Sequence, residues 1–565
     1  GRCALSLVVK ARVLVRAGQA SLAEERFRRA IASDPDGGWA YWGLGQLERA
    51  RGRHAASLDW FESAFQRCPQ SRDMALALHE ATLAAGSHPR GEAILRKALH
   101  QRPLDRRLRF LLTDLLLRQG KHAEAMAEIE SSMVDFGVDD GILAAALSVR
   151  QRIGTACAPG RRKSGGTVSL CMIGKNEEKH LPRCLRCARP IVAEIVVVDT
   201  GSTDRTRDIA GAFGARVFDF PWNDDFAAAR NFSLTQAAGD WILVLDADEL
   251  ISPNDHEAFR ALIDPAAPAK RAFRIRTRNY TRQGNTVGWQ PNRAEYPEEE
   301  GLGWFPSDKV RLFPNDPRIR FVHPVHELVE PTLRRWKIGV DACPIPVHHF
   351  GKLEEARTIE KTKAYRDLGR KKLTKNASDP ASLRELAIQS AHLEKHEEAL
   401  ALWKQYARRQ PRSAEAFVNM GSACWSLGRY AEAARHAERA HRLDPSLKEA
   451  PFNRAIAWLM MGRAGEAKAI LQPLLSRHPH YSAAQFMMCV ACACLGEGAA
   501  AAHWLGELRA TPLGPHLGAS FFDAARRLFA ASQLQYARRT LETARDHRYS
   551  SDAMTALLDA CRVAA

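Results

Sequence analysis

Two kinds of segment are missing from this chain of 565 residues. It has no apolar run of the roughly 18 residues that a membrane-spanning helix requires, and the longest candidate, 486–496, is too short. Its twelve cysteines do not follow the regular spacing of a disulfide framework, which argues against a small secreted scaffold. We therefore expect a cytoplasmic protein. Peripheral binding at the inner face of the membrane stays open.

Several functional motifs are also missing. There is no Gly-rich loop of the P-loop type and no His-Glu-x-x-His helix of a zinc protease. No basic tract is interleaved with aromatic residues, so we predict no nucleic-acid partner. The net charge of +17 comes from Lys and Arg spread between apolar positions, which indicates a solvated basic surface. Acidic partners, such as a nucleotide sugar, a phosphorylated glycan or an anionic membrane face, stay open.

Two cysteine clusters have spacings that zinc sites use. They are 184–187 and 489–494. Each falls within a predicted helix among apolar residues, where a free cysteine behaves as a small hydrophobic side chain. We interpret both clusters as core thiols.

What the sequence does contain is a period of 34 residues over its first 140 positions. Two helices joined at a Gly and ended by a Pro explain the pattern, because Gly suits the tight turn and Pro cannot continue a helix. The period resembles that of tetratricopeptide repeats. It returns from about residue 379, and after 512 a divergent capping pair is expected. The recurring residues are Gly18, Gly52, Gly86, Gly120, Pro35, Pro69 and Pro103, and later Gly428, Gly462, Gly496, Pro411, Pro445 and Pro479.

Between the two repeat regions, short aliphatic runs end in carboxylates. One run leads to Asp199, and another leads to Asp246 and Asp248. Such runs, alternating with helical segments, predict βαβ units and a parallel sheet. Carboxylates at the carboxyl ends of its strands lie where open α/β sheets bind ligands. Since Mg²⁺ and Mn²⁺ suit one or two carboxylates plus substrate phosphates, we predict a site for a nucleotide and either cation.

Four pieces of this region stand out: Ile-Gly-Lys-Asn-Glu-Glu (173–178), Val-Val-Asp-Thr-Gly-Ser-Thr-Asp (197–204), Ala-Arg-Asn (229–231) and Leu-Asp-Ala-Asp-Glu (245–249). In order and spacing they resemble the nucleotide-sugar half of a family 2 inverting glycosyltransferase of the GT-A fold. The stretch 222–231 further resembles the branch of that family that pairs such a domain with tetratricopeptide repeats. The fold implied is an α/β, Rossmann-like GT-A domain inserted between two all-α repeat arrays.

The resemblance implies donor-binding roles when it is carried over residue by residue. Asn176 and Glu177 would lie beside the nucleoside, and Asp199 would accept hydrogen bonds from the base or ribose. Asp246 would contact the ribose. Arg230 would lie near the diphosphate or orient the acidic pair, a role that suits a planar cationic fork.

Metal ligands and a base are implied on the same ground. Asp248 would bind the metal of the diphosphate, and His349 would complete that site, with His348 as the neighbour it could be confused with. An inverting transfer also needs a base for the acceptor proton, and a carboxylate is the usual group. We predict Glu327, after an expected strand; the alternatives are Glu330 and Asp308.

These patterns divide the chain into repeats (1–153), a linker (154–166), a glycosyltransferase domain (167–375) and repeats with capping helices (376–565). The domain would have a donor half, 167–250, and an acceptor half, 251–352. The expected reaction moves a sugar from a nucleotide-diphosphate sugar, UDP-linked, to a glycan, lipid-linked or protein acceptor. The repeats would recruit the acceptor or a protein partner. The alternative is a repeat scaffold that carries an inactive transferase domain.

Overall fold

A computed structural model describes most of the chain. The described residues are 2–154, 166–263, 271–282, 289–324, 327–354, 362–363, 366–367, 369–370, 373, 379–511 and 513–564. The expected linker at 154–166 lies almost wholly outside them. The chain forms two compact units: residues 1–163, 167–221 and 236–239 make the first, and residues 164–166, 222–235 and 240–565 make the second.

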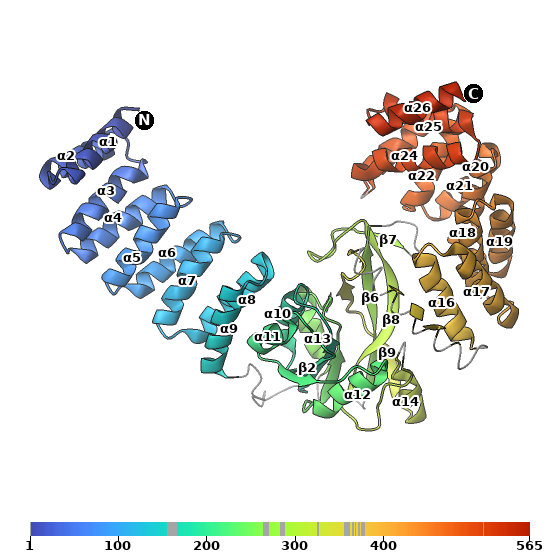
Figure 1. Cartoon of the computed structure of the whole chain (residues 1–565), viewed down its shortest axis with the longest axis horizontal. Helices are drawn as coiled ribbons and strands as arrows, with labels where there is room; N and C mark the ends of the chain where they lie inside the picture. Colours follow the sequence, from blue (N-terminus) through green and yellow to red (C-terminus); the bar gives the residue numbers. More distant parts are fainter. Residues whose placement is uncertain are drawn as a thin grey trace. The chain divides into compact units, whose positions relative to one another are not determined.

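The first unit begins with paired helices that stack in chain order (Figure 1). A glycine with positive φ ends the first helix of each repeat, for example Gly52 at 73°, a conformation that other residues adopt only with strain. Small residues sit where helices approach closely: a Cβ on Gly43 would overlap the ring of Phe27. The helices are α1 (Arg2–Arg16), α2 (Ala20–Ser33), α3 (Gly38–Ala50), α4 (His54–Arg67), α5 (Arg72–Ala84), α6 (His88–Gln101), α7 (Arg106–Arg118), α8 (His122–Phe136) and α9 (Asp140–Ile153).

The same unit continues with a parallel sheet in the order β3-β2-β1. Strand β2 is buried along its whole length, as its aliphatic run predicts. It ends at Asp199, level with Gly174 at the end of β1. The elements are β1 (Val168–Gly174), α10 (Leu181–Ala188), η1 (Arg189–Ile191), β2 (Glu194–Asp199), α11 (Thr206–Ala212) and β3 (Arg216–Asp219).

The second unit holds a mixed sheet built around two long antiparallel strands, β6 and β8. Its order is β4-β8-β6-β10-β5, with β7 paired to β8 and β9 to β6. The sequence predicted only short strands here. The elements are α12 (Phe226–Gln236), β4 (Trp241–Val244), β5 (Glu249–Leu250), η2 (Pro253–Asp255), α13 (His256–Leu262), β6 (Arg271–Thr281), β7 (Gln290–Pro291), β8 (Gly303–Pro314), α14 (Glu330–Arg335), β9 (Gly339–Ala342) and β10 (Val347–His349).

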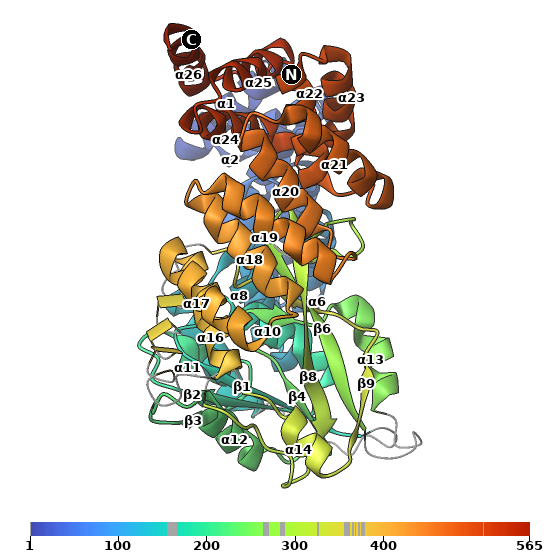
Figure 2. The same ribbon diagram turned by 90° about the vertical axis from the view of Figure 1, so that its right-hand side faces the viewer.

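Paired helices follow in the same unit and stack in chain order (Figure 2). The predicted all-α architecture on both sides of an α/β region is thus confirmed. In the described part of the chain, no helix is both long and apolar enough to span a membrane. The helices are α16 (Pro380–His392), α17 (His396–Arg409), α18 (Ala414–Ser426), α19 (Tyr430–Leu443), α20 (Glu449–Met460), α21 (Ala464–Arg477), α22 (Ser482–Leu495), α23 (Gly498–Arg509), η3 (Gly514–His516), α24 (Leu517–Ala530), α25 (Leu534–Asp546) and α26 (Asp552–Val563).

Candidate functional site

The three predicted donor residues of the first unit lie in two neighbouring loops. Asp199 is 2% exposed, and its carboxylate accepts hydrogen bonds from the backbone N–H groups of Gly201 and Ser202. Asn176 has a φ of 57°, and its Oδ1 accepts from the backbone N–H of Thr203 at 2.8 Å. The loop after β1 is therefore tied to the loop after β2, and Asn176 serves to hold the two loops in register.

Glu177 lies in the same group. Its backbone N–H donates to Thr206 Oγ1 at 2.7 Å, and its side chain is buried. The turn 201–206 follows Asp199 and supplies the partners of both Asn176 and Glu177. Asn176 and Glu177 thus lie just beyond the carboxyl end of β1, and Asp199 lies at the carboxyl end of the neighbouring strand β2.

In the second unit, Arg230 joins two predicted functional carboxylates. It lies on α12 and is 8% exposed. Its Nε donates to Glu327 Oε1 at 2.6 Å, and its Nη2 donates to Asp246 Oδ1 at 2.8 Å. One guanidinium thus fixes two carboxylates that are far apart in the sequence, as the fixed fork of arginine allows.

The electrostatics of this group favour its charged form. Burial acts to lower the pKa of Arg230, but the attraction of Asp246 and Glu327 outweighs it and raises that pKa above its ordinary value. Burial likewise acts to raise the pKa of Asp246; the attraction of Arg230, helped by Lys309 and Arg311, instead holds it well below its usual range. Within the triad of Arg230, Asp246 and Glu327, the side chains of Arg230 and Asp246 are therefore charged at neutral pH.

The segment that carries Glu327 is anchored to α12. Asn231 donates through Nδ2 to the carbonyl of Phe321 and accepts at Oδ1 from the N–H of the same residue. The N–H of Phe226 donates to the carbonyl of Pro324. The expected strand before Glu327 is wrong: Val322 and Leu328 form an isolated β-bridge that closes a loop. His326 lies outside the described residues.

Asp248 and His349 form a second group. Asp248 is 6% exposed, and its Oδ1 lies 3.5 Å from His349 Nε2. Strand β10 brings the histidine there by pairing with β5, where His349 lies opposite Glu249. His348 points to the other face, where its Nδ1 lies 2.7 Å from the hydroxyl of Tyr280. The structure thus separates the two histidines that the sequence could confuse.

Asn279 on β6 determines the tautomer of His349. Its Nδ2 donates to the carbonyl of Phe305 at 2.9 Å and to Ser307 Oγ at 3.0 Å, so its Oδ1 is the atom that faces His349 Nδ1 at 2.7 Å. His349 then donates a proton from Nδ1 to Asn279, so its neutral tautomer presents the lone pair of Nε2 toward Asp248. Two electron-rich atoms at this separation suit a cation shared between them.

Gly351 leaves the space that such a cation needs. A Cβ at this position would overlap Asp248 Oδ2 and would lie 2.8 Å from His349 Nε2. A carboxylate and an imidazole, with an amide behind the imidazole and a glycine that leaves the space open, fit a divalent cation that keeps further positions for phosphate oxygens and water.

Comparison with known proteins identifies the families of the domains. Residues 169–315 match the family "Glycosyl transferase family 2". Residues 8–72, 76–136, 392–447 and 425–485 match tetratricopeptide repeat families. The chain contains a glycosyltransferase family 2 domain flanked on both sides by tetratricopeptide repeats.

Individual relatives cover parts of the chain. A TPR repeat-containing protein of Synechococcus elongatus is 37% identical over 206 residues, which are 34% of this chain and 45% of that protein. An uncharacterized glycosyltransferase of Rickettsia typhi is 38% identical over 85 residues, 15% of this chain and 29% of its own length. The chain thus spans less than half the length of these curated relatives. Among solved structures, YrrB, described as a TPR protein with an unusual peptide-binding site, aligns with 33% of this chain and 96% of its own at 17% identity and a TM-score of 0.26.

Glu249 and Asn279, both in the family 2 domain, support the site although the sequence did not predict them as part of it. Glu249 accepts the backbone N–H of Asp246 at 2.9 Å and forms a buried, bidentate ion pair with Arg311. Both side chains are 3% exposed. The turn between Asp246 and Asp248 is therefore held from behind by a fixed carboxylate. The role of Glu249 could have been predicted from its position in Asp-Ala-Asp-Glu. No sequence signal indicated Asn279, because its role depends on the pairing of β6 with β10.

The alternative bases of the family 2 domain lie elsewhere. Asp308 accepts two hydrogen bonds from Arg276, at 3.0 and 3.3 Å, and lines a cavity of about 500 Å³ with several arginines. Arg276 and Asn279 differ by an odd number of positions on β6, so this cavity opens on the sheet face opposite His349. Glu330 begins α14. Among the three candidates, Glu327 is the one bonded to Arg230.

Replacing Arg230 tests the triad. Arg230→Met keeps much of the side-chain volume but leaves Asp246 and Glu327 without their shared cation, so burial alone would raise the pKa of Asp246. We expect the free energy of unfolding at pH 7 to fall by about 2 kcal/mol. This is less than the usual cost of breaking a buried ion pair, because Asp246 is partly exposed. The unfolded-state pKa of Asp246, about 3.9, is common to both proteins, so the difference between them depends on the two folded-state pKa values. The loss should be complete above the raised pKa of Asp246 in the variant and should shrink as the pH falls below it.

Urea unfolding between pH 3.5 and pH 8 measures this effect. Arg271→Met is the matched control, since Arg271 pairs with Asp341 at 2.9 Å on the surface and should cost less than about 0.5 kcal/mol. A loss for Arg230→Met that is independent of pH would contradict the electrostatic account.

Proposed function

We propose that the chain is an inverting, metal-dependent glycosyltransferase that takes a sugar from a nucleotide-diphosphate sugar, UDP-linked, and attaches it to a glycan, a lipid-linked glycan or a protein. The observation that carries the proposal is the pair of Asp248 and His349, whose facing oxygen and nitrogen lie 3.5 Å apart. This pair combines a carboxylate with an imidazole of fixed tautomer, and Gly351 leaves open space beside both. A loop with a purely structural role does not require this combination.

The donor is held by residues with distinct tasks in this proposal. Asp199 accepts hydrogen bonds from the base or ribose, with Glu177 beside it, while Asn176 keeps their loops in place. Asp246 contacts the ribose. Asp248 and His349 hold Mn²⁺ or Mg²⁺, which when bound neutralises charge on the departing nucleoside diphosphate.

Glu327 is the base in this mechanism. The acceptor hydroxyl attacks the anomeric carbon from the face opposite the leaving diphosphate and gives its proton to the Glu327 carboxylate. Arg230 holds Oε1 of that carboxylate, which leaves Oε2 for the proton. The same guanidinium holds Asp246, so a shift of the donor-contacting carboxylate is transmitted to the base. Arg230 is thus a positioning residue.

The tetratricopeptide repeats are assigned to recruitment. Stacked helix pairs present extended concave surfaces that bind other chains, and here they adjoin the transferase domain in the sequence at both ends. We propose that they bind the acceptor or a protein partner. No nucleic-acid partner is part of the proposal.

Donor hydrolysis tests the activity and its metal requirement. A panel of UDP-, GDP- and ADP-sugars is incubated with the whole chain, with Mn²⁺ or with a chelator, and released nucleotide is measured. We expect turnover of one donor with Mn²⁺, none with chelator, and a loss of about 100-fold or more in Asp248→Ala. Asp308→Ala, on the opposite sheet face, should retain activity. No turnover of any donor would favour the inactive scaffold.

The base has a separate test. Glu327→Gln keeps the shape of the side chain but cannot take a proton, so transfer should slow by about 10²- to 10⁴-fold while donor binding, measured by calorimetry, stays within a few-fold of wild type. Glu330→Gln is the matched control and should transfer normally. Near-normal transfer by Glu327→Gln would remove Glu327 from this role.

A further inference from the structure

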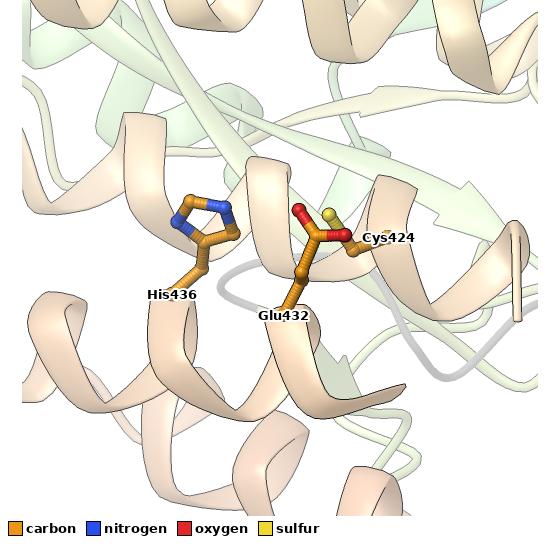
Figure 3. A group of neighbouring side chains, drawn as sticks. All are labelled: Cys424, Glu432 and His436. Atoms are coloured by element: carbon orange, nitrogen blue, oxygen red, sulfur yellow. The ribbon is translucent and has the colours of Figure 1, made fainter. Parts of the chain in front are cut away.

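Three metal-ligating side chains meet in one of the C-terminal helix pairs. Cys424 lies on α18, and Glu432 and His436 lie on α19. One ligand atom from each of the three lies within 4.8 Å of the other two. Figure 3 shows Glu432 and His436 side by side on one helix, with Cys424 on the facing helix. The 184–187 and 489–494 cysteine clusters take no part in this group.

The spacing suits coordination. Residues four apart lie on the same face of a helix, so Glu432 and His436 approach Cys424 together. In a tetrahedral zinc site with ligand bonds of about 2.0–2.3 Å, the ligand atoms lie about 3.5 Å apart. The separations in the group therefore exceed this spacing by no more than about 1.3 Å, a difference that side-chain rotation in these three residues can remove.

The carboxylate of Glu432 is not committed to an ion pair within the described residues, unlike its counterparts. The equivalent residue one repeat earlier, Glu398, pairs with Arg370. The equivalent one repeat later, Glu466, pairs with Arg463. Arg429 stands where Arg463 does, but it pairs with Glu397. A surface ion pair therefore does not account for Glu432.

His436 is held in a form that can bind a metal. Its ring stacks on Phe417, with centroids 6.2 Å apart and planes at 26°. Burial, followed by Lys404 and other nearby cations, lowers the pKa of His436, although Glu432 acts against them. The imidazole is therefore neutral at pH 7, the state in which a ring nitrogen can ligate.

The repeat itself provides a comparison. Positions equivalent to these three occur in neighbouring repeats at a spacing of 34 residues, and they carry side chains that only fill space or form surface pairs. None of those sets contains three ligands, so helix packing in this array does not demand a cysteine, a carboxylate and an imidazole together. The equivalent sets are Ser390, Glu398 and Leu402; Trp458, Glu466 and Ile470; and Cys492, Ala500 and Trp504.

We propose that Cys424, Glu432 and His436 bind a transition-metal ion, Zn²⁺ by the chemistry of the ligands, which ties α18 to α19. A thiolate, an imidazole and a carboxylate are the three ligand types that zinc uses in proteins. Binding releases the thiol proton of Cys424. The fourth position takes water or a side chain of a bound partner. This site is independent of the proposed transferase chemistry.

Cobalt substitution tests the site in the whole chain. Co²⁺ bound to a thiolate gives an intense sulfur-to-metal charge-transfer band, which a site of Asp248 and His349 cannot give. We expect one thiolate-bound Co²⁺ per chain, displaced by Zn²⁺. The band should disappear in Cys424→Ser, and affinity should fall at least about tenfold in His436→Gln and in Glu432→Gln.

Cys492→Ser is the matched control. Cys492 occupies the position of Cys424 two repeats later, is also buried, and has Ala500 and Trp504 in place of the other two ligands. It should keep the full band. The proposal is overturned if wild type shows no charge-transfer band, or if the band persists in Cys424→Ser. Should Cys424→Ser fail to fold, unchanged Co²⁺ affinity in both His436→Gln and Glu432→Gln would equally overturn it.

Discussion

The candidate site depends on one guanidinium. Arg230 bridges Asp246, in the turn after β4, and Glu327, in a loop more than eighty residues later. Removing a buried cation from between two carboxylates leaves their charges uncompensated. The loop that bears Glu327 is in turn anchored to α12 by Asn231. Helix α12 therefore sets the positions of the residue proposed as base and of the residue proposed to contact the donor.

Other fixed polar groups hold the turn after β4 and the imidazole of His349 in place. The Glu249–Arg311 pair holds the turn between Asp246 and Asp248, and Asn279 orients His349. In the proposed function these groups do not touch the substrate. They reduce the freedom of the residues that would, so that less rearrangement is needed when a cation and a diphosphate bind.

The fold followed from the sequence where a pattern was local. The 34-residue period predicted the helix pairs, and the aliphatic run before Asp199 predicted a buried strand. Candidate site residues could be located from the sequence where they belong to a contiguous motif, as in Asp-Ala-Asp-Glu. The Asn279–His349 contact was not, since it depends on pairing between strands distant in the sequence. The loop of Glu327 was mistaken for the end of a strand because its apolar residues pair only at one bridge.

The most direct measurement is the position of the cation. Crystals of the whole chain soaked with Mn²⁺ and a nucleoside diphosphate are measured at the manganese absorption edge. We expect an anomalous peak about 2.0–2.3 Å from both His349 Nε2 and an Asp248 carboxylate oxygen. Bound nucleotide with no peak at these two residues, or with a peak held by other side chains, would contradict it.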